Sequence, residues 1–242
     1  MFSEFKKIPI VKPKWQNLPN ILAFATLAES GGKRLSFCEN FGSSVKARKN
    51  MEKLLEPSEP VKWLKQVHGN RVLKLPEEKN IAEADGAVTN KKRIACVILT
   101  ADCLPVVFAT KSQKAAGVAH AGWRGMVSGV IPNAISALNC NPAEIYVWLG
   151  PAIGALSFEV GSEVFDKFIE ADSDNKKAFK PGKPGKYYAD LYELAYIQLI
   201  KAGINKNNIE FEKHDTFTNS RFHSARRDGA ASGRMATVVM IK

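Results

Sequence analysis

Three short apolar runs follow one another closely in the middle of the chain, at residues 95–99, 105–109 and 115–119. Each run is continuous, and a polar turn at residues 111–114 separates the second run from the third. Short continuous apolar runs bounded by turn signals are typical of strands that are buried on both faces. The stretch therefore predicts a set of buried strands around which the rest of the fold is organised.

Polar side chains stand at the ends of two of these expected strands. Asp102 and Cys103 come shortly after the first run, and His120 follows the third. Such residues project toward loops, where sites are usually built, and thiolate and imidazole are both good zinc ligands. Cys103 and His120 are therefore candidate metal ligands. A buried free cysteine and a hydrogen-bonded core histidine explain them as well, because their separation matches no ligand signature.

The motif GWRG, at residues 122–125, follows His120 directly. Two glycines around Arg124 allow both the backbone and the guanidinium group to approach an anion closely. A helix is expected at residues 127–138, and its first N–H groups would point at the same anion.

Two further segments carry candidate residues. Residues 66–70 break an alternating pattern at a glycine bend, where Gln66 and His68 lie, and on this pattern alone His68 is a surface residue. In the tail, Arg226, Arg227 and Arg234 lie near glycines. These arginines suit anion binding, but Arg–Asp pairs that pin a loop explain them equally well.

The remaining pattern alternates strands and helices, which indicates a mixed layered domain. We predict the α+β class, with residues 1–242 forming one layered domain of mixed β-sheets flanked by helices and residues 1–20 forming an irregular entry segment. The other expected elements are strands at 20–27, 145–149 and 236–241, helices at 43–55, 162–169 and 190–202, and a polar loop at 171–186.

The chain carries a net charge of +11, which suits nucleic acid and small anionic substrates alike. The charges are scattered, and no nucleic-acid-binding motif is recognisable, so no nucleic acid is expected as a partner. The sequence has no apolar run near 18 residues and no signal-peptide pattern, and its four cysteines form no disulfide framework. A cytoplasmic protein without a membrane segment is expected.

Seven further motifs can be recognised in the chain: KQVHGNRV at 65–72, ADG at 84–86, TADCLPV at 100–106, HAGWRG at 120–125, WLGPAIG at 148–154, FEVG at 158–161 and RRDGAASGRMA at 226–236. Together they resemble the YfiH/laccase-domain family, whose members are also called purine nucleoside phosphorylases, multicopper polyphenol oxidoreductases and peptidoglycan editing factors. The resemblance covers the chain from about residue 60 to the end.

The resemblance implies a zinc ion held by His68, Cys103 and His120. It also implies phosphorolysis of adenosine, inosine or methylthioadenosine by inorganic phosphate, with adenosine deamination as a side activity. We assign candidate catalytic roles to Asp102, Cys103 and Arg124, with Asp102 acting as a proton carrier or, as we favour, as support for the Cys ligand. The candidate substrate-binding residues are Gln66, Arg124, Arg226 and Arg227.

Three alternatives stay open. A copper-dependent polyphenol oxidase would need more ligands than these three. A peptidoglycan editing hydrolase or amidase would use Cys103 as its nucleophile, which requires a thiolate free of metal. A basic nucleic-acid-binding protein would bind with steep salt dependence. The sequence does not determine the oligomeric state.

The chain departs from the family pattern at three places. Many members carry Thr-Arg-x-Gly-Gly near the N-terminus, where residues 27–32 contain no arginine, and many carry Cys-Thr where this chain has Asp215 and Thr216. Ala225 stands where many have tyrosine. These departures bear on substrate preference and activity, and they leave the three expected ligands intact.

Overall fold

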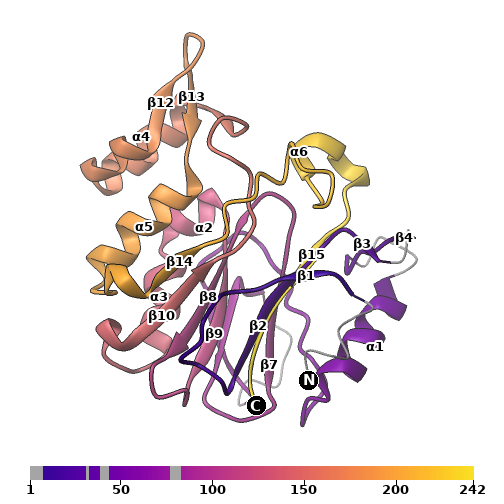
Figure 1. Ribbon diagram of the computed structural model, residues 1–242. Coiled ribbons are helices and arrows are strands. Elements are labelled where there is room, and N and C mark those ends of the chain that lie inside the picture. The colour runs from indigo at the N-terminus through magenta and orange to yellow at the C-terminus, as the bar shows by residue number, and fades with distance from the viewer. Residues whose placement is uncertain (1–7, 31–32, 39–43, 77–82) are drawn as a thin grey trace.

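The computed structural model describes residues 8–30, 33–38, 44–76 and 83–242. Two β-sheets pack face to face, and helices cover their outer faces (Figure 1). The α+β class with mixed sheets flanked by helices is thereby confirmed.

The smaller of the two packed sheets has four antiparallel strands, and it joins segments from both ends of the chain. In spatial order they are β1 (Ile10–Val11), β2 (Ile21–Thr26), β15 (Met235–Ile241) and β7 (Ala95–Thr100). The expected C-terminal strand is therefore central. Within the predicted irregular entry segment, β1 forms the edge of this sheet, and residues 1–7 lie outside the described part.

The larger sheet has six strands and is mixed. In spatial order they are β14 (Ile209–Phe211), β10 (Ile145–Leu149), β8 (Leu104–Thr110), β9 (Ala116–Ala121), β6 (Gly86–Thr89) and β5 (Val72–Leu75). The outer pairs β14–β10 and β6–β5 are parallel, and the other neighbours are antiparallel.

The continuous apolar runs arise because both faces of each central strand are covered. Along β8, Val107 faces the other sheet while Val106 and Phe108 face the helices. Along β15, Val239 faces the larger sheet while Val238 packs toward α1 (Ser44–Leu55). Complete burial of each such side chain stabilises the fold by about 1.5–3 kcal/mol.

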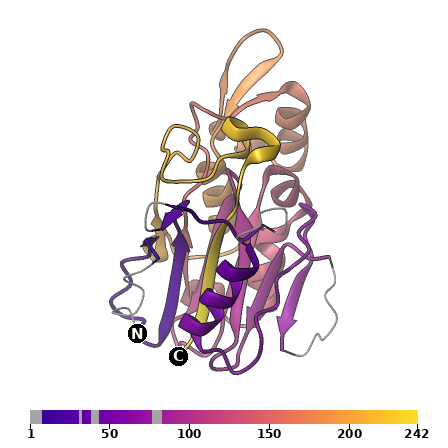
Figure 2. The same ribbon diagram turned by 90° about the vertical axis from the view of Figure 1, so that its right-hand side faces the viewer.

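Helices cover the two outer faces of this sandwich (Figure 2). Helix α1 covers the four-stranded sheet, whereas α3 (Val130–Ala137) and α5 (Leu191–Lys201) share a core with the six-stranded sheet. Asp190 caps α5 by accepting hydrogen bonds from the backbone N–H groups of Tyr192 and Glu193, at 2.9 and 3.1 Å. The remaining helices are α2 (Trp123–Ser128), α4 (Ser162–Ala171) and α6 (Ala225–Asp228).

The prediction of one continuous helix at 127–138 was wrong, because the segment forms two helices and the first begins earlier. The first helix, α2, begins four residues earlier at Trp123, and Gly129 ends it with a left-handed φ of 94° before α3 begins. Gly129 donates its N–H to the carbonyls of Gly125 and Met126, so the break is a glycine cap. Because α2 has only six residues, its N-terminus is a weak anion site, and Arg124 is the stronger candidate for binding an anion.

The prediction of a polar loop at 171–186 was also wrong. This segment contains a 3-10 helix at Ser173–Ala178 and the strand β12 (Phe179–Pro181), which pairs with β13 (Lys186–Ala189). With β11 (Glu159–Gly161) they form a small sheet that projects with α4 at the top of Figure 1. The rings of Phe165 and Tyr187 stack with centroids 4.2 Å apart, and this contact between α4 and the hairpin is invisible to local patterns.

Two short strands, β3 (Glu29–Ser30) and β4 (Lys33–Arg34), pair near α1. Residues 31–32, which separate the two strands in sequence, lie outside the described residues. No helix in the described ranges is both long and apolar enough to cross a membrane.

Candidate metal centre

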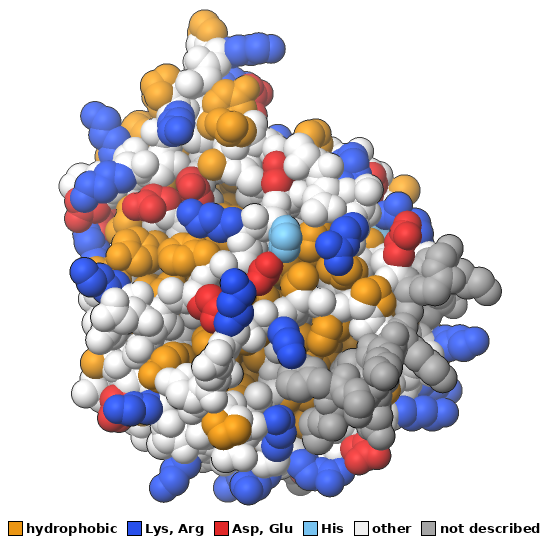
Figure 3. Space-filling view, in the orientation of Figure 1, with side chains coloured by type: hydrophobic (Ala, Val, Ile, Leu, Met, Phe, Trp, Pro, Cys, Tyr) orange, Lys and Arg blue, Asp and Glu red, His pale blue; other side chains and the backbone are white. Residues whose placement is uncertain are grey.

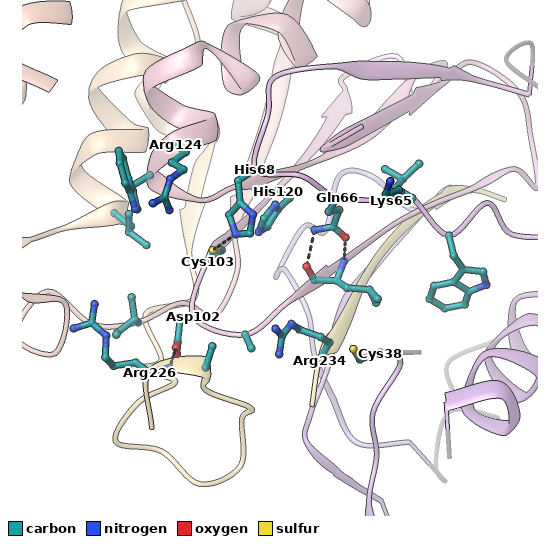
Figure 4. A pocket seen from close by; sticks show the side chains of 18 of the residues that line it. Cys38, Lys65, Gln66, His68, Asp102, Cys103, His120, Arg124, Arg226 and Arg234 are labelled. Carbon is teal, nitrogen blue, oxygen red and sulfur yellow. Dashed lines mark hydrogen bonds between the residues drawn. The ribbon is translucent and has the colours of Figure 1, made fainter. Parts of the chain in front are cut away.

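Three residues far apart in sequence converge at one end of the larger sheet. The ligand atoms of His68, Cys103 and His120 all lie within 4.8 Å of one another (Figure 4). The Cys103 Sγ is 3.8 Å from the His68 Nε2, and the two imidazole rings meet edge to face with centroids 4.8 Å apart. Within the part of the chain that the structure describes, this is the one group of three or more such residues that could hold a metal ion.

The β8–β9 hairpin explains how Cys103 and His120 meet. Strand β8 leads away from the site and β9 returns beside it, with Leu104 paired to Ala121 and Pro105 paired to His120. Cys103 immediately precedes β8, so the antiparallel register places it beside the end of β9. The sequence suggested that His120 follows the third strand, but it lies within β9. Its side chain is only 4% exposed.

His68 reaches the site from a bend with a left-handed backbone, where its φ is 60°. The Asp85 carboxylate accepts hydrogen bonds from the backbone N–H groups of Val67, His68 and Gly69 in this bend, at 3.1, 2.9 and 2.7 Å. Asp85 is fully buried, and its Oδ1 also accepts a hydrogen bond from His120 Nδ1 at 2.8 Å. Sequence reasoning missed Asp85, although the ADG motif that contains it was a signal.

The protein groups alone set the charge states of this cluster. Burial raises the pKa of the Cys103 thiol, but the imidazoles of His120 and His68 outweigh burial and lower it below its ordinary value. Burial lowers the pKa of His120, but Cys103 and Asp85 outweigh it and raise that pKa. Burial likewise raises the pKa of Asp85, while hydrogen bonds from His120 and the bend hold it low. A thiolate is therefore favoured at neutral pH, and the thiolate is the form that binds metals.

The donor set suits zinc. One thiolate and two imidazoles are ordinary zinc ligands, and three protein ligands leave a fourth position for water or substrate, as catalytic zinc sites do. A tetrahedral zinc ion holds such ligand atoms roughly 3.3–3.6 Å apart, so small rotations of these side chains toward one another would let one ion contact all three. The residues therefore fit the metal that the sequence motifs suggested.

A cavity of about 860 Å³ opens beside the three residues. Asp102 is the one acidic side chain among the described residues that line it. Its cationic lining residues are Arg48, Lys65, Arg124, Arg226 and Arg234. In Figure 4, Arg124 and Arg226 lie on one side of Cys103, and Arg234 lies on the other. The cavity therefore favours an anionic ligand.

The arginines differ in how much of their hydrogen-bonding capacity the protein uses. The Arg124 guanidinium lies over the Trp123 ring, 4.3 Å from its centroid. Arg226 donates one hydrogen bond to the carbonyl of Glu159 at 3.1 Å. Arg234 donates through Nη1 to the carbonyls of Ser232 and Gly233, which holds the guanidinium in place. Sequence reasoning noted Arg234 in the tail but did not select it, because nothing local separates it from its neighbours.

The structure does not bring Arg227 to the cavity wall. Its guanidinium donates to the carbonyls of Thr216, Phe217 and Phe222, at 2.9–3.0 Å, and pairs with Asp228. This arrangement is the loop-pinning alternative that the sequence left open.

Gln66 and Asp102 line the cavity, but both side chains form hydrogen bonds that hold neighbouring segments of the protein in place. The Gln66 amide donates to the carbonyl of Leu99 at 2.8 Å and accepts from the backbone N–H of Leu99 at 2.7 Å. The Asp102 carboxylate accepts from the hydroxyls of Thr216 and Ser224 and from the backbone N–H of Arg226. Asp102 thus anchors the tail beside Cys103, which favours support over proton transfer.

The charge of the chain is spread over its surface. On the face shown in Figure 3, Lys and Arg side chains are interspersed with apolar and acidic ones rather than gathered in one stripe.

Fold and site together define an α+β protein with a His–Cys–His group at the wall of a cationic cavity. The family model described as multi-copper polyphenol oxidoreductase laccase matches residues 42–242, and the chain belongs to this family.

Relatives and solved structures agree with this assignment. The Haemophilus influenzae protein named purine nucleoside phosphorylase is 39% identical, over 95% of this chain and 98% of its own length. The Escherichia coli protein named purine nucleoside phosphorylase YfiH is 42% identical, over 76% of this chain and 75% of its own. The crystal structure of Neisseria meningitidis protein NMB0706 is 33% identical and superposes with a TM-score of 0.90, covering 98% of this chain and all of that one.

Proposed function

We propose that the protein is a zinc-dependent purine nucleoside phosphorylase. The reaction would convert adenosine, inosine or methylthioadenosine and inorganic phosphate to the free base and the sugar 1-phosphate, with adenosine deamination as a side activity. One observation carries the proposal: the His68, Cys103 and His120 ligand atoms lie within 4.8 Å of one another at the wall of a cavity lined by arginines. The names of the relatives support the same reaction class.

The cavity suits these substrates in size and charge. Its volume of about 860 Å³ lies within the ordinary range for small-molecule sites, roughly 300–1,000 Å³. Arg124 and Arg226 lie on the same side of Cys103, and their guanidinium groups provide the donor geometry that phosphate oxygens accept. They would hold phosphate, and the nucleoside would occupy the cavity between them and the three ligands.

His68, Cys103 and His120 would hold the metal. Zinc bound there would supply a Lewis acid that polarises an oxygen ligand and lowers the pKa of a bound water. Arg124 would orient phosphate for attack at the sugar C1′ carbon as the bond from C1′ to the base breaks.

Copper fits this site less well. Multicopper oxidation needs several metal ions close together, and the residues described here offer one three-ligand group. The purified protein should therefore contain about one zinc ion per chain, measured by elemental analysis.

The decisive experiment incubates the metal-loaded protein with inosine and phosphate and follows hypoxanthine and ribose 1-phosphate. We expect both products in equal amounts, their loss in Cys103→Ala, and their loss on chelation with recovery on adding zinc. Hypoxanthine without ribose 1-phosphate would contradict phosphorolysis, and the absence of both products would contradict the proposal. Adenosine given without phosphate tests the deaminase activity through formation of inosine.

One arrangement favours a second candidate, a hydrolase with Cys103 as its nucleophile. Cys103, His120 and Asp85 are in contact in that order, as nucleophile, base and orienting carboxylate are in thiol hydrolases. This candidate requires a Cys103 thiolate free of metal. It predicts rapid alkylation of Cys103 by iodoacetamide in zinc-loaded protein, whereas the phosphorylase proposal predicts protection.

A further inference from the structure

Asp85 contacts both histidines of the candidate metal centre, and the proposed phosphorylase reaction has given it no role. Its Oδ1 accepts hydrogen bonds from the backbone N–H of His68 at 2.9 Å and from the His120 ring at 2.8 Å. A single oxygen atom therefore joins the two histidines. The side chain is fully buried, so no water competes for these contacts.

The backbone of Asp85 strengthens this link. Its carbonyl accepts a hydrogen bond from the His120 N–H at 2.7 Å, and its own N–H donates to the carbonyl of Arg71 at 3.0 Å. Side chain and backbone together tie the 66–71 segment to β9. The position of His68 relative to His120 is thus set largely through this one residue.

The hydrogen bond to the His120 ring also selects which ring nitrogen faces the other ligands. A carboxylate only accepts hydrogen bonds, so His120 Nδ1 donates its proton toward Asp85. In the neutral imidazole, which is the form that binds a metal, Nε2 is then the nitrogen free to act as a ligand. This is the arrangement by which carboxylates fix the orientation and tautomer of metal-bound histidines.

We propose that Asp85 is a positioning residue that fixes the tautomer of His120 and the bend of His68 together. Asp85 thereby orients both imidazoles toward the position of the ion before the metal binds. The inference rests on the proposed function only in taking the three residues as metal ligands, and it does not depend on which substrate the enzyme converts.

Asp85→Asn tests the proposal with little change in volume. An amide in place of the carboxylate keeps one acceptor oxygen and turns an NH₂ group toward donors of the bend or of His120. Asp215→Asn is the matched control, because the Asp215 carboxylate also holds a loop, through Gly154, Ser157 and Phe217, without touching a histidine.

The first readout is zinc affinity, measured by competition with a chromophoric chelator. We expect Asp85→Asn to lower the affinity about 10- to 100-fold, the range seen when carboxylate partners of metal-bound histidines are removed, and Asp215→Asn to leave it unchanged. Equal affinities in Asp85→Asn, Asp215→Asn and the unsubstituted protein would overturn the proposal. Thermal unfolding of each variant, with and without zinc, separates metal loss from unfolding.

The second readout is the proton position on His120, found by ¹⁵N NMR of histidine-labelled, zinc-loaded protein. We expect His120 to carry its proton on Nδ1 and to exchange it slowly with water, and we expect that exchange to accelerate in Asp85→Asn. A proton on Nε2 in the unsubstituted protein would overturn the proposal even if Asp85→Asn did not fold. Neither readout uses a nucleoside, so failure of phosphorolysis would leave this inference standing.

Discussion

A Cβ atom on Gly122 would lie 3.0 Å from the Sγ of Cys103 and 3.1 Å from the Cδ2 of His68. Gly122 is therefore the residue that leaves room for two of the three ligands to meet. Its φ of −68° is open to any residue, so the requirement is for space rather than for backbone freedom.

Gly122→Ala should weaken zinc binding about tenfold or more, because the added methyl group would displace Cys103 and His68. Displacing a ligand should lower zinc affinity at least as much as removing a residue that supports a ligand. Gly69→Ala is the matched control in the same site, because its Cβ would meet nothing closer than 3.5 Å. Chelator competition measures both affinities. Equal affinities for the two variants would mean that the crowding at Gly122 relaxes at no cost.

Arg124→Ala should raise the KM for phosphate about 10- to 100-fold, since a hydrogen bond to a charged group contributes roughly 1.5–3 kcal/mol. The KM for the nucleoside should change much less. Initial rates with phosphate varied at saturating inosine measure the effect. The exposed Lys111, in the turn at the far end of the β8–β9 hairpin, provides a control through Lys111→Ala. An unchanged KM for phosphate in Arg124→Ala would show that other side chains hold it.

Arg227→Ala should destabilise the fold by about 2–3 kcal/mol, because three carbonyls of the tail lose a charged donor. Arg227→Lys should restore little, since one ammonium group cannot reach all three. Urea unfolding gives the free energies, and Arg221→Ala, at an exposed site, is the comparison. A stable Arg227→Ala variant with a raised KM for phosphate would instead support the substrate-binding role predicted from the sequence.

Asp215 should make stability depend on pH. Burial raises the pKa of its carboxyl, but hydrogen bonds from Ser157, Gly154 and Phe217 outweigh burial and hold the pKa below its ordinary value of 3.8. Because the pKa is lower in the folded state, the stabilisation is present above that ordinary value and is lost as the pH falls through the folded-state pKa.

The stability gap between the unsubstituted protein and Asp215→Asn should thus be widest near neutral pH and should close below about pH 4. Urea unfolding across this range measures it, with Asp166→Asn, an exposed position on α4, as the control. A gap that stays constant with pH would show that the carboxylate charge plays no part in holding the 154–157 loop.

The candidate site divides into what local pattern predicts and what it does not. Cys103, His120 and Arg124 were selected from local pattern, whereas His68 was selected only through the family resemblance. The structure brings the three candidate ligands together, with Arg124 beside the same cavity. Asp85 was passed over, because a buried aspartate between alanine and glycine has no visible partner until the bend and β9 are placed against it.

The sequence by itself determined the buried strands, since continuous apolar runs report burial on both faces, and it determined the helix expected at 190–202, since an amphipathic repeat is set by neighbouring turns of the helix. Tertiary structure alone decided that Arg227 pins the tail while Arg234 faces the cavity, and that Asp102 holds residues more than a hundred positions away. The reason is physical. Apolar periodicity and capping act over a few residues, whereas the partner of a buried charge depends on which distant segments the packed sheets bring into contact.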